Sequence, residues 1–181
     1  MNEGLIPRRY AKALYMYALE KHVDDKIYQM MKTLAGSFEQ QPDLQSVLNN
    51  PYAGVSDKMQ LLLTAAGASS DDAVYSDFLK LLENNRRLGL ARDIAIAYMG
   101  IYRESNKIYE VKVVSAAPLT KAEDSRLRTL VQRHLQGGTM EFSTAVNPSL
   151  IGGFTVSVGN ERIDASVSNE LKQLRLNLLS K

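Results

Sequence analysis

The chain of 181 residues has no cysteine, no tryptophan and only two histidines. Without cysteine it can form no disulfide, no thiolate nucleophile and no cysteine-ligated metal site. The two histidines, His22 and His134, lie far apart in the sequence, each at or near the end of a predicted helix. Because a metal site needs clustered ligands, we expect neither a metal nor a cofactor.

Long hydrophobic runs and an excess charge of one sign are also missing. The 22 basic and 20 acidic residues leave a net charge of +2, which gives no overall attraction to nucleic acid or anionic lipid. No run of about 18 apolar residues occurs. The first 20 residues carry Arg8, Arg9 and Lys12 and do not resemble a secretory signal. We therefore expect no direct membrane insertion, so that any membrane association comes through a partner.

The sequence contains no recognisable catalytic arrangement. Gly152 and Gly153 precede a predicted strand and Gly159 lies in a predicted tight turn, so the glycines match neither nucleotide-binding pattern. The acidic pairs Asp24–Asp25 and Asp71–Asp72 open predicted helices, where the helix dipole accounts for them. No serine lies in a G-x-S-x-G motif. We therefore predict that the protein is not an enzyme.

The pattern of apolar residues changes near residue 105. Before that point, apolar residues recur at helical spacing and short breaks separate six segments, which predicts an all-α six-helix bundle over residues 1–105. The first helix is predicted over Leu5–Glu20 and carries two adjacent apolar stripes, more than one core contact requires. The second is predicted over Asp24–Glu39, and Pro42 opens the third.

Residues 106–181 are predicted to form a small α+β domain. Two segments alternate as strands, and the helix between them begins with a capping box of Thr120 and Glu123. The stretch "FTVSVGNERIDAS" predicts a hairpin with a turn at Gly159–Asn160, which places Val156 opposite Ile163 and Thr155 opposite Asp164. We expect four residues to form the inner face of the helix after the first strand: Leu127, Leu130, Val131 and Leu135.

The last predicted helix begins after Ser166. Its apolar residues are spaced by 4, 3 and 4, as in a coiled-coil seam, and we expect this stripe to pack on the hairpin sheet: Val167, Leu171, Leu174 and Leu178.

Two clusters of basic residues leave alternatives open. One contains Arg8, Arg9 and Lys12, and the other contains Arg86 and Arg87. They fit a solvated face, and basic charge at a helix N-terminus also hints at an acidic partner. An RNA-binding or antitermination-type adaptor is the alternative function, although such modules usually have a more basic surface with aromatic stacking residues. From the residues alone, we predict two domains that have no catalytic site and that serve a binding role.

Four stretches resemble the delta subunit of F-type ATP synthase, whose mitochondrial counterpart is the oligomycin-sensitivity-conferring protein. They are spread over nearly the whole chain, from residue 8 to residue 179, in the family's order: "RRYAKALYMYA" (8–18), "FLKLLENNRRL" (78–88), "EVKVVSAAPLT" (110–120) and "NPSLIGGFTVSVGNERIDASVSNELKQLRLNLL" (147–179). One position departs from the family pattern, because Ala165 stands where the family usually has glycine in I-D-G-S. If that position required a positive φ, alanine would be strained there.

The resemblance implies a non-catalytic stator subunit that links the catalytic head to the peripheral stalk and resists torque during proton-driven ATP synthesis. It implies one copy per complex, at the cytoplasmic face of the cell inner membrane. The implied partners are the N-terminal segments of the alpha subunits, which would bind residues 1–105 through the first and fifth helices, and the b subunits, which would bind residues 106–181.

On that basis we assign candidate contact residues to each partner. For the alpha subunit they are Ile6, Arg9, Tyr10, Ala13, Leu14, Tyr17, Val74, Phe78, Leu81 and Asn85. For the b subunit they are Lys172, Arg175, Leu176 and Leu179.

Overall fold

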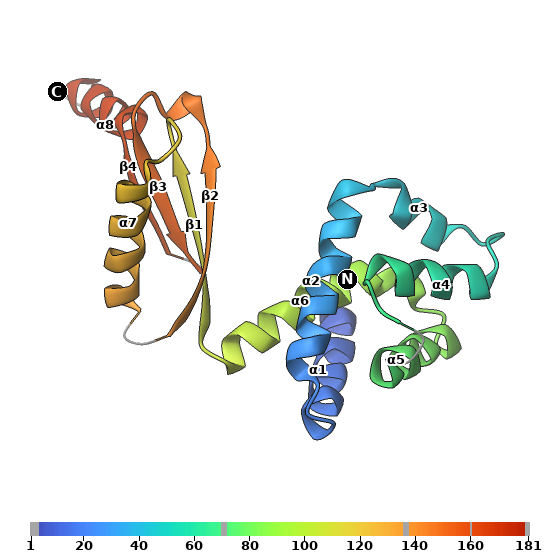
Figure 1. The fold of residues 1–181 in the computed structure, drawn as a ribbon. Helices are drawn as coiled ribbons and strands as arrows, with labels where there is room; N and C mark the ends of the chain where they lie inside the picture. The colour runs from blue at the N-terminus through green and yellow to red at the C-terminus, as the bar shows by residue number, and fades with distance from the viewer. Residues whose placement is uncertain (1–3, 70–71, 136–137, 160, 180–181) are drawn as a thin grey trace. The chain divides into compact units, whose positions relative to one another are not determined.

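The computed structural model describes residues 4–69, 72–135, 138–159 and 161–179, with the side chains of His134 and Leu179 left out. By their internal contacts the residues separate into two compact units, Met1–Arg103 and Glu104–Lys181 (Figure 1). The first is helical, and the second contains a mixed four-stranded sheet with helices. This confirms the predicted fold class, an all-α region followed by an α+β region.

The first unit contains the six predicted helices. α1 spans the predicted Leu5–Glu20, α2 extends one residue beyond the predicted end, and a short 3₁₀ segment, η1 (Leu88–Leu90), precedes α6. The helices are α1 (Leu5–Glu20), α2 (Asp24–Gln40), α3 (Asp43–Asn49), α4 (Val55–Ala65), α5 (Ala73–Asn84) and α6 (Ala91–Ser105).

Large apolar side chains from α1, α2, α5 and α6 are buried inside this unit. Leu14 of α1, Met31 of α2 and Leu82 of α5 are almost completely buried there, together with Ile94 of α6. These residues lie on the apolar stripes of their helices, and burying such stripes is what stabilises helices of this length. The core therefore fixes α1 and α5 as neighbours.

Four tyrosines form a cluster between α1, α2 and α6. The rings of Tyr28 and Tyr102 stack with centroids 4.2 Å apart, and Tyr15 meets the edges of Tyr98 and Tyr102 at 5.9 and 6.3 Å. The Tyr98 hydroxyl donates to the Asp24 carbonyl oxygen (3.1 Å), and the Tyr102 hydroxyl donates to a carboxylate oxygen of Asp25 (3.2 Å). Burial raises the pKa of both phenols, with Asp24 and Asp25 adding to the effect, and the pKa of Tyr102 reaches about 12.

This cluster predicts that the helical unit loses stability in alkali. Because the folded-state pKa values lie above the ordinary tyrosine value of about 10, the stabilisation is complete below about pH 10 and is lost as pH rises through the folded pKa. Urea unfolding between about pH 9 and 12 should show the loss, and Tyr98→Phe combined with Tyr102→Phe should flatten it. An equal slope in the wild-type protein and the double variant would contradict this assignment.

The second unit is built on a four-stranded sheet in the order β2-β1-β3-β4 (Figure 1). β1 and β2 are parallel and are joined through α7, whereas β3 pairs antiparallel with both β1 and β4. The elements are β1 (Ile108–Ser115), α7 (Lys121–His134), β2 (Thr139–Val146), η2 (Pro148–Leu150), β3 (Gly153–Val158), β4 (Glu161–Ser166) and α8 (Val167–Leu179).

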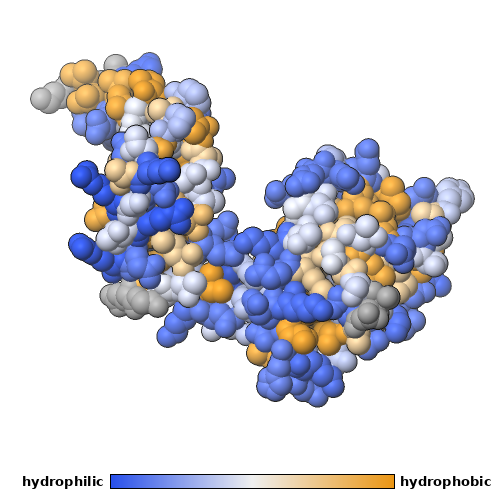
Figure 2. Space-filling view, in the orientation of Figure 1, coloured by the Kyte–Doolittle hydropathy of each residue, from blue (hydrophilic) through white to orange (hydrophobic). Residues whose placement is uncertain are grey.

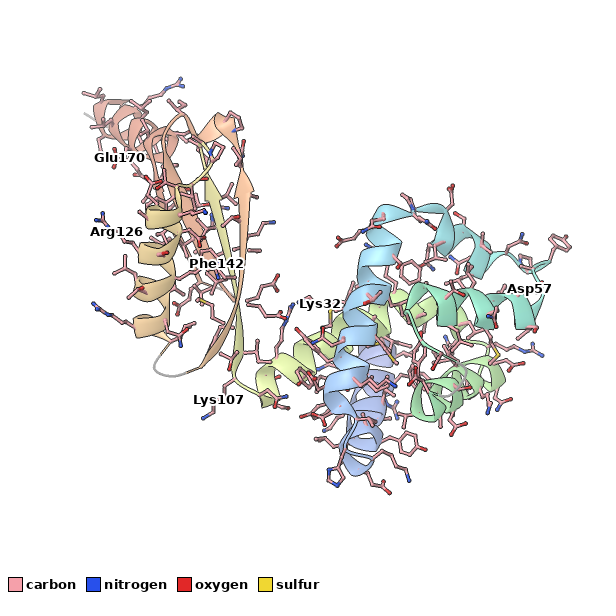
Figure 3. The ribbon with its side chains drawn as sticks, viewed as in Figure 1. Lys32, Asp57, Lys107, Arg126, Phe142 and Glu170 are labelled. Carbon is pink, nitrogen blue, oxygen red and sulfur yellow. The ribbon has the colours of Figure 1, made fainter. Side chains whose placement is uncertain are left out.

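α7 covers one face of this sheet. Val111, Val113 and Val156 of the strands pack against Leu127 and Val131 of the helix and against Leu135, which directly follows it. Phe142, labelled in Figure 3, joins this layer, and the Arg128 guanidinium lies 4.1 Å from the centre of its ring. The inner face differs from the predicted one at Leu130, which is exposed. At 100° per residue, Leu130 lies outside the sector that the three buried residues span.

Local features of the second unit follow the sequence closely. The capping box is present, since the Thr120 hydroxyl accepts from the Glu123 N–H and the Glu123 carboxylate accepts from the Thr120 N–H (2.8 Å). The predicted hairpin register is confirmed in the pairing of β3 with β4. Asn160 of the predicted turn lies outside the described residues.

Ala165 pairs with Phe154 in the hairpin and is not among the non-glycine residues with a positive φ, so alanine is unstrained there. The position near Ala165 that requires glycine is Gly153, on the neighbouring strand β3. Gly153 has φ of +73°, and a Cβ on it would overlap the Ala165 carbonyl oxygen.

Candidate partner-binding surfaces

A groove of about 380 Å³ lies between α1 and the end of α5. Its lining residues are Ile6, Arg9, Tyr10, Ala13, Leu81 and Arg87. The four residues from α1 lie at i, i+3, i+4 and i+7, which places them on one stripe of the helix. The other stripe of α1, with Ala11, Leu14 and Ala18, is buried in the core. α1 therefore packs through one stripe and presents the second at the surface.

The groove combines an apolar lining with cationic margins. Ile6 and Tyr10 are half-buried, and Leu81 from α5 is 45 % exposed. Arg9 and Arg87 are exposed at its sides. An arrangement of this size and character suits an amphipathic helix, whose apolar face enters the groove while its carboxylates meet the arginines.

The structure brings five of the predicted alpha-contacting residues to this groove: Ile6, Arg9, Tyr10, Ala13 and Leu81. It places Leu14 and Phe78 in the core instead. Tyr17 and Val74 are half-buried and do not line the groove. Asn85 is exposed just after α5, where its side-chain amide donates to the Leu81 carbonyl oxygen (2.8 Å).

Arg87 is the groove residue that the sequence analysis did not assign to this site. Its basic character is evident from the sequence, but its position depends on the turn after α5. Arg86 there adopts a left-handed φ of +54°, and the Arg87 N–H donates to the Leu82 carbonyl oxygen (2.7 Å). This closing turn brings Arg87 beside α1.

The second candidate surface is α8, whose start is fixed by a small polar network. The Ser166 hydroxyl and N–H both donate to one carboxylate oxygen of Asp164 (2.6 and 3.1 Å), and the Asn169 N–H donates to the Ser166 hydroxyl (3.2 Å). The hydrogen bond from the Ser166 side chain is the main reason why the pKa of Asp164 is lowered. The Val167 N–H also donates to the Gly152 carbonyl oxygen (3.0 Å).

The expected packing of the α8 stripe on the hairpin sheet is wrong. Val167, Leu171, Leu174 and Leu178 are all exposed, and the exposed fraction of Leu178 reaches 77 %. The residues of α8 that interact with β4 are polar: the Asn169 side chain donates to the Asp164 carbonyl oxygen (3.5 Å), and the Lys172 charge acts on Asp164. The polar residues near the start of α8 thus interact with β4, while the four residues of the stripe are exposed.

The residues predicted to contact the b subunit lie on this helix. Arg175 and Leu176 are exposed, and Lys172 is exposed near Asp164. The side chain of Leu179 lies outside the described ones. Figure 2 shows a dense hydrophobic area over the end of the second unit where α8 lies.

Within the described ranges, no three histidine, aspartate or glutamate side chains are grouped as metal ligands. Among the same residues, no helix has both the length and the apolar character required to cross a bilayer.

Comparison with known proteins gives one consistent family. Residues 6–178 match the family model described as the ATP synthase delta (OSCP) subunit. The chain is 40% identical over 179 residues to the ATP synthase subunit delta of Parabacteroides distasonis, covering 99% of this chain and 98% of that one. It is 36% identical over 182 residues to the subunit of the same name from Bacteroides thetaiotaomicron, covering 100% and 97%.

The fold is also similar to a chain in the structure of the Toxoplasma gondii mitochondrial ATP synthase hexamer. The two share a TM-score of 0.75 at 21% identity, covering 96% of this chain and 97% of the other. A family match over nearly the whole length and full-length relatives at this identity leave no support for the RNA-binding alternative. The chain belongs to the ATP synthase delta (OSCP) subunit family, whose members are non-catalytic stator subunits of the F-type ATP synthase.

Proposed function

We propose that the chain links the catalytic head to the peripheral stalk through two separate docking surfaces. The groove between α1 and α5 binds the N-terminal segment of an alpha subunit as an amphipathic helix. α8 binds the b subunits of the stalk, with contacts that include Lys172, Arg175, Leu176 and Leu179. One copy serves each complex at the cytoplasmic face of the inner membrane, held there by its partners.

The observation that carries this proposal is the groove itself. Its apolar residues come from both helices, and the apolar side chains of Ile6, Tyr10 and Leu81 are incompletely buried in the free chain. Apolar side chains that line a helix-sized groove lose their contact with water when a partner helix enters, which is the main source of affinity at such sites. Arg9 and Arg87 favour a partner segment that carries carboxylates beside its apolar face.

A stator link does not depend on a reactive site. A subunit that holds the head against the torque of the rotor needs contacts that persist, and a stable specific contact buries at least about 1,000 Å². Two surfaces on separate units let one chain bind two partners at once. This function requires no proton transfer, nucleophile or bound metal.

The test is whether one chain joins both partners simultaneously. The full chain, immobilised through a tagged alpha-subunit N-terminal segment from the same genome, should retain the C-terminal segment of the b subunit. Deleting residues 1–20 removes α1 and one wall of the groove. The shortened chain should therefore leave the support, and the b segment should leave with it. Direct binding of the two segments to each other without the chain would count against the proposal, as would competition between them for it.

A further inference from the structure

We infer that a polar pocket beside the groove is a second part of the same binding site and receives a carboxylate side chain of the bound alpha-subunit segment. This pocket, called the α3 pocket, has a volume of about 480 Å³ and lies between α3 and the stretch that connects α5 to α6. The inference rests on the proposed function and deepens it, because it adds a subsite that selects an acidic partner residue. The lining residues that carry it are Gln45, Asn49, Arg86, Arg87, Gly89 and Asp93.

Arg87 joins the α3 pocket to the groove, because it lines both cavities. A helix whose apolar face enters the groove between Tyr10 and Leu81 places polar residues beside Arg87. From there a side chain can reach the α3 pocket. The two cavities thus form one continuous surface with an apolar part and a polar part.

The pocket presents two cations that no carboxylate of this chain neutralises. Arg86 and Arg87 are exposed, and neither forms an ion pair with another described residue. The left-handed φ of Arg86 (+54°) and its N–H bond to the Glu83 carbonyl oxygen (2.7 Å) fix the turn that carries both side chains. Such a backbone conformation is costly for arginine and is concentrated at functional sites. Two adjacent arginines without a counter-charge favour an anionic partner.

Two side-chain amides and a glycine complete the lining. The Gln45 amide donates to the Gly89 carbonyl oxygen (2.9 Å), which ties α3 to η1. Gly89 leaves room for Asn49, because a Cβ on Gly89 would lie 2.6 Å from Asn49 Oδ1. The same oxygen accepts from Gln45 Nε2 (3.4 Å), so the exposed NH₂ group of Asn49 is left as a donor for a carboxylate.

Asp93 limits the charge of the ligand. It lies in the first turn of α6, where the helix dipole favours a carboxylate. With Arg86 and Arg87 it leaves the pocket with a net charge of +1, from two positive groups and one negative group. One carboxylate neutralises this charge, whereas a phosphate group brings a further negative charge close to Asp93. We therefore assign the pocket to an aspartate or glutamate side chain of the segment.

A pair of arginine variants tests the pocket. Arg86→Asn removes the charge, and asparagine tolerates the left-handed conformation at this position. Arg92→Asn is the matched control, because Arg92 is exposed in the first turn of α6 and lines neither cavity. In calorimetric titration of the full chain with the alpha-subunit N-terminal segment, Arg86→Asn should weaken binding about tenfold. Arg92→Asn should change it about twofold or less, and circular dichroism of both variants should match the wild type.

Variants of the segment identify the carboxylate. Each aspartate or glutamate of the segment is replaced in turn by its amide. One replacement should weaken binding to the wild-type chain about tenfold and change binding to Arg86→Asn about twofold or less, because the two members of a contacting pair are not additive.

The outcomes separate the pocket from the groove. If the wild-type chain binds the segment but Arg86→Asn and Arg92→Asn have equal affinities, or no carboxylate is coupled to Arg86, the subsite is wrong and the groove stands. No binding by the wild-type chain overturns both. Inorganic phosphate at constant ionic strength provides the last comparison. If it lowers the affinity of the wild-type chain to that of Arg86→Asn and leaves the variant unchanged, the pocket binds a free anion and the inference is wrong.

Discussion

Replacing Leu81 with glutamate is expected to weaken binding of the alpha-subunit N-terminal segment at least about 100-fold while leaving the fold intact. Leu81 is the α5 residue that lines the groove beside α1. When a partner helix covers the groove, a carboxylate at this position loses its hydration, and it competes with the carboxylates of the partner for Arg9 and Arg87. Because Leu81 is 45 % exposed in the free chain, the variant should unfold at nearly the wild-type urea concentration.

Leu19→Glu is the matched control for this variant. Leu19 lies in the last turn of α1, is 42 % exposed and does not line the groove. Calorimetric titration of the alpha segment should therefore give near-normal affinity with Leu19→Glu. Equal affinities for the two variants would show that the segment binds elsewhere on the chain.

Gly153→Ala is expected to destabilise the second unit by about 3–5 kcal/mol, from left-handed backbone strain together with steric overlap. Gly153 opens β3 with φ of +73°, and an added methyl group would overlap the carbonyl oxygen of Ala165 on β4. The two strands cannot separate without losing the hairpin, and the hairpin leads directly into α8. A unit of this size has little stability in reserve, so most of it should unfold.

Hydrogen exchange of the full chain can follow each unit separately. Protection should be lost in residues 108–179 and retained in residues 5–103, and binding of the b segment should disappear while binding of the alpha segment persists. Gly159→Ala is the control, because Gly159 also has a positive φ (+55°) but its Cβ would point into open space. The control should cost about 1 kcal/mol, and a similarly small cost for Gly153→Ala would rule out the steric argument.

Local patterns predicted most of the secondary structure. The helices follow from apolar residues at helical spacing, and α1 spans the predicted residues. The capping box and the hairpin register depend on neighbouring residues only, and both are confirmed. The sheet order was not predicted. Pairing of β1 with β2 across the whole of α7 depends on contacts between distant residues, which no local period encodes.

The same distinction between local patterns and distant contacts explains which residues of the groove could be predicted. The spacing of Ile6, Tyr10 and Ala13 placed them on one stripe, and the structure brings them together. Leu14 lies next to that stripe and is buried, because spacing alone does not divide a broadly apolar helix between its core and its surface. Arg87 reaches the groove through the left-handed turn at Arg86, and an arginine in that conformation has no clear sequence signal.

The stripe of α8 formed by Val167, Leu171, Leu174 and Leu178 shows the opposite kind of error. Its heptad spacing predicts a helix with one apolar stripe, but spacing does not require that such a stripe packs against its own domain. Asp164, Ser166 and Asn169 instead join the polar start of the helix to β4. An apolar stripe in a sequence predicts that one face of a helix will be buried. It does not predict whether the same chain or a partner buries that face.

The outward leucines of α8 also have a consequence for a copy that has not yet been assembled. Before assembly, such a molecule has a C-terminal helix with exposed apolar side chains. Exposed apolar segments of this kind bind chaperones and promote aggregation at high concentration. On the proposed assembly, the side chains that the stalk covers stay exposed in surplus subunits, which favours their removal. The exposed stripe therefore favours production of this subunit in proportion to the other subunits of the enzyme.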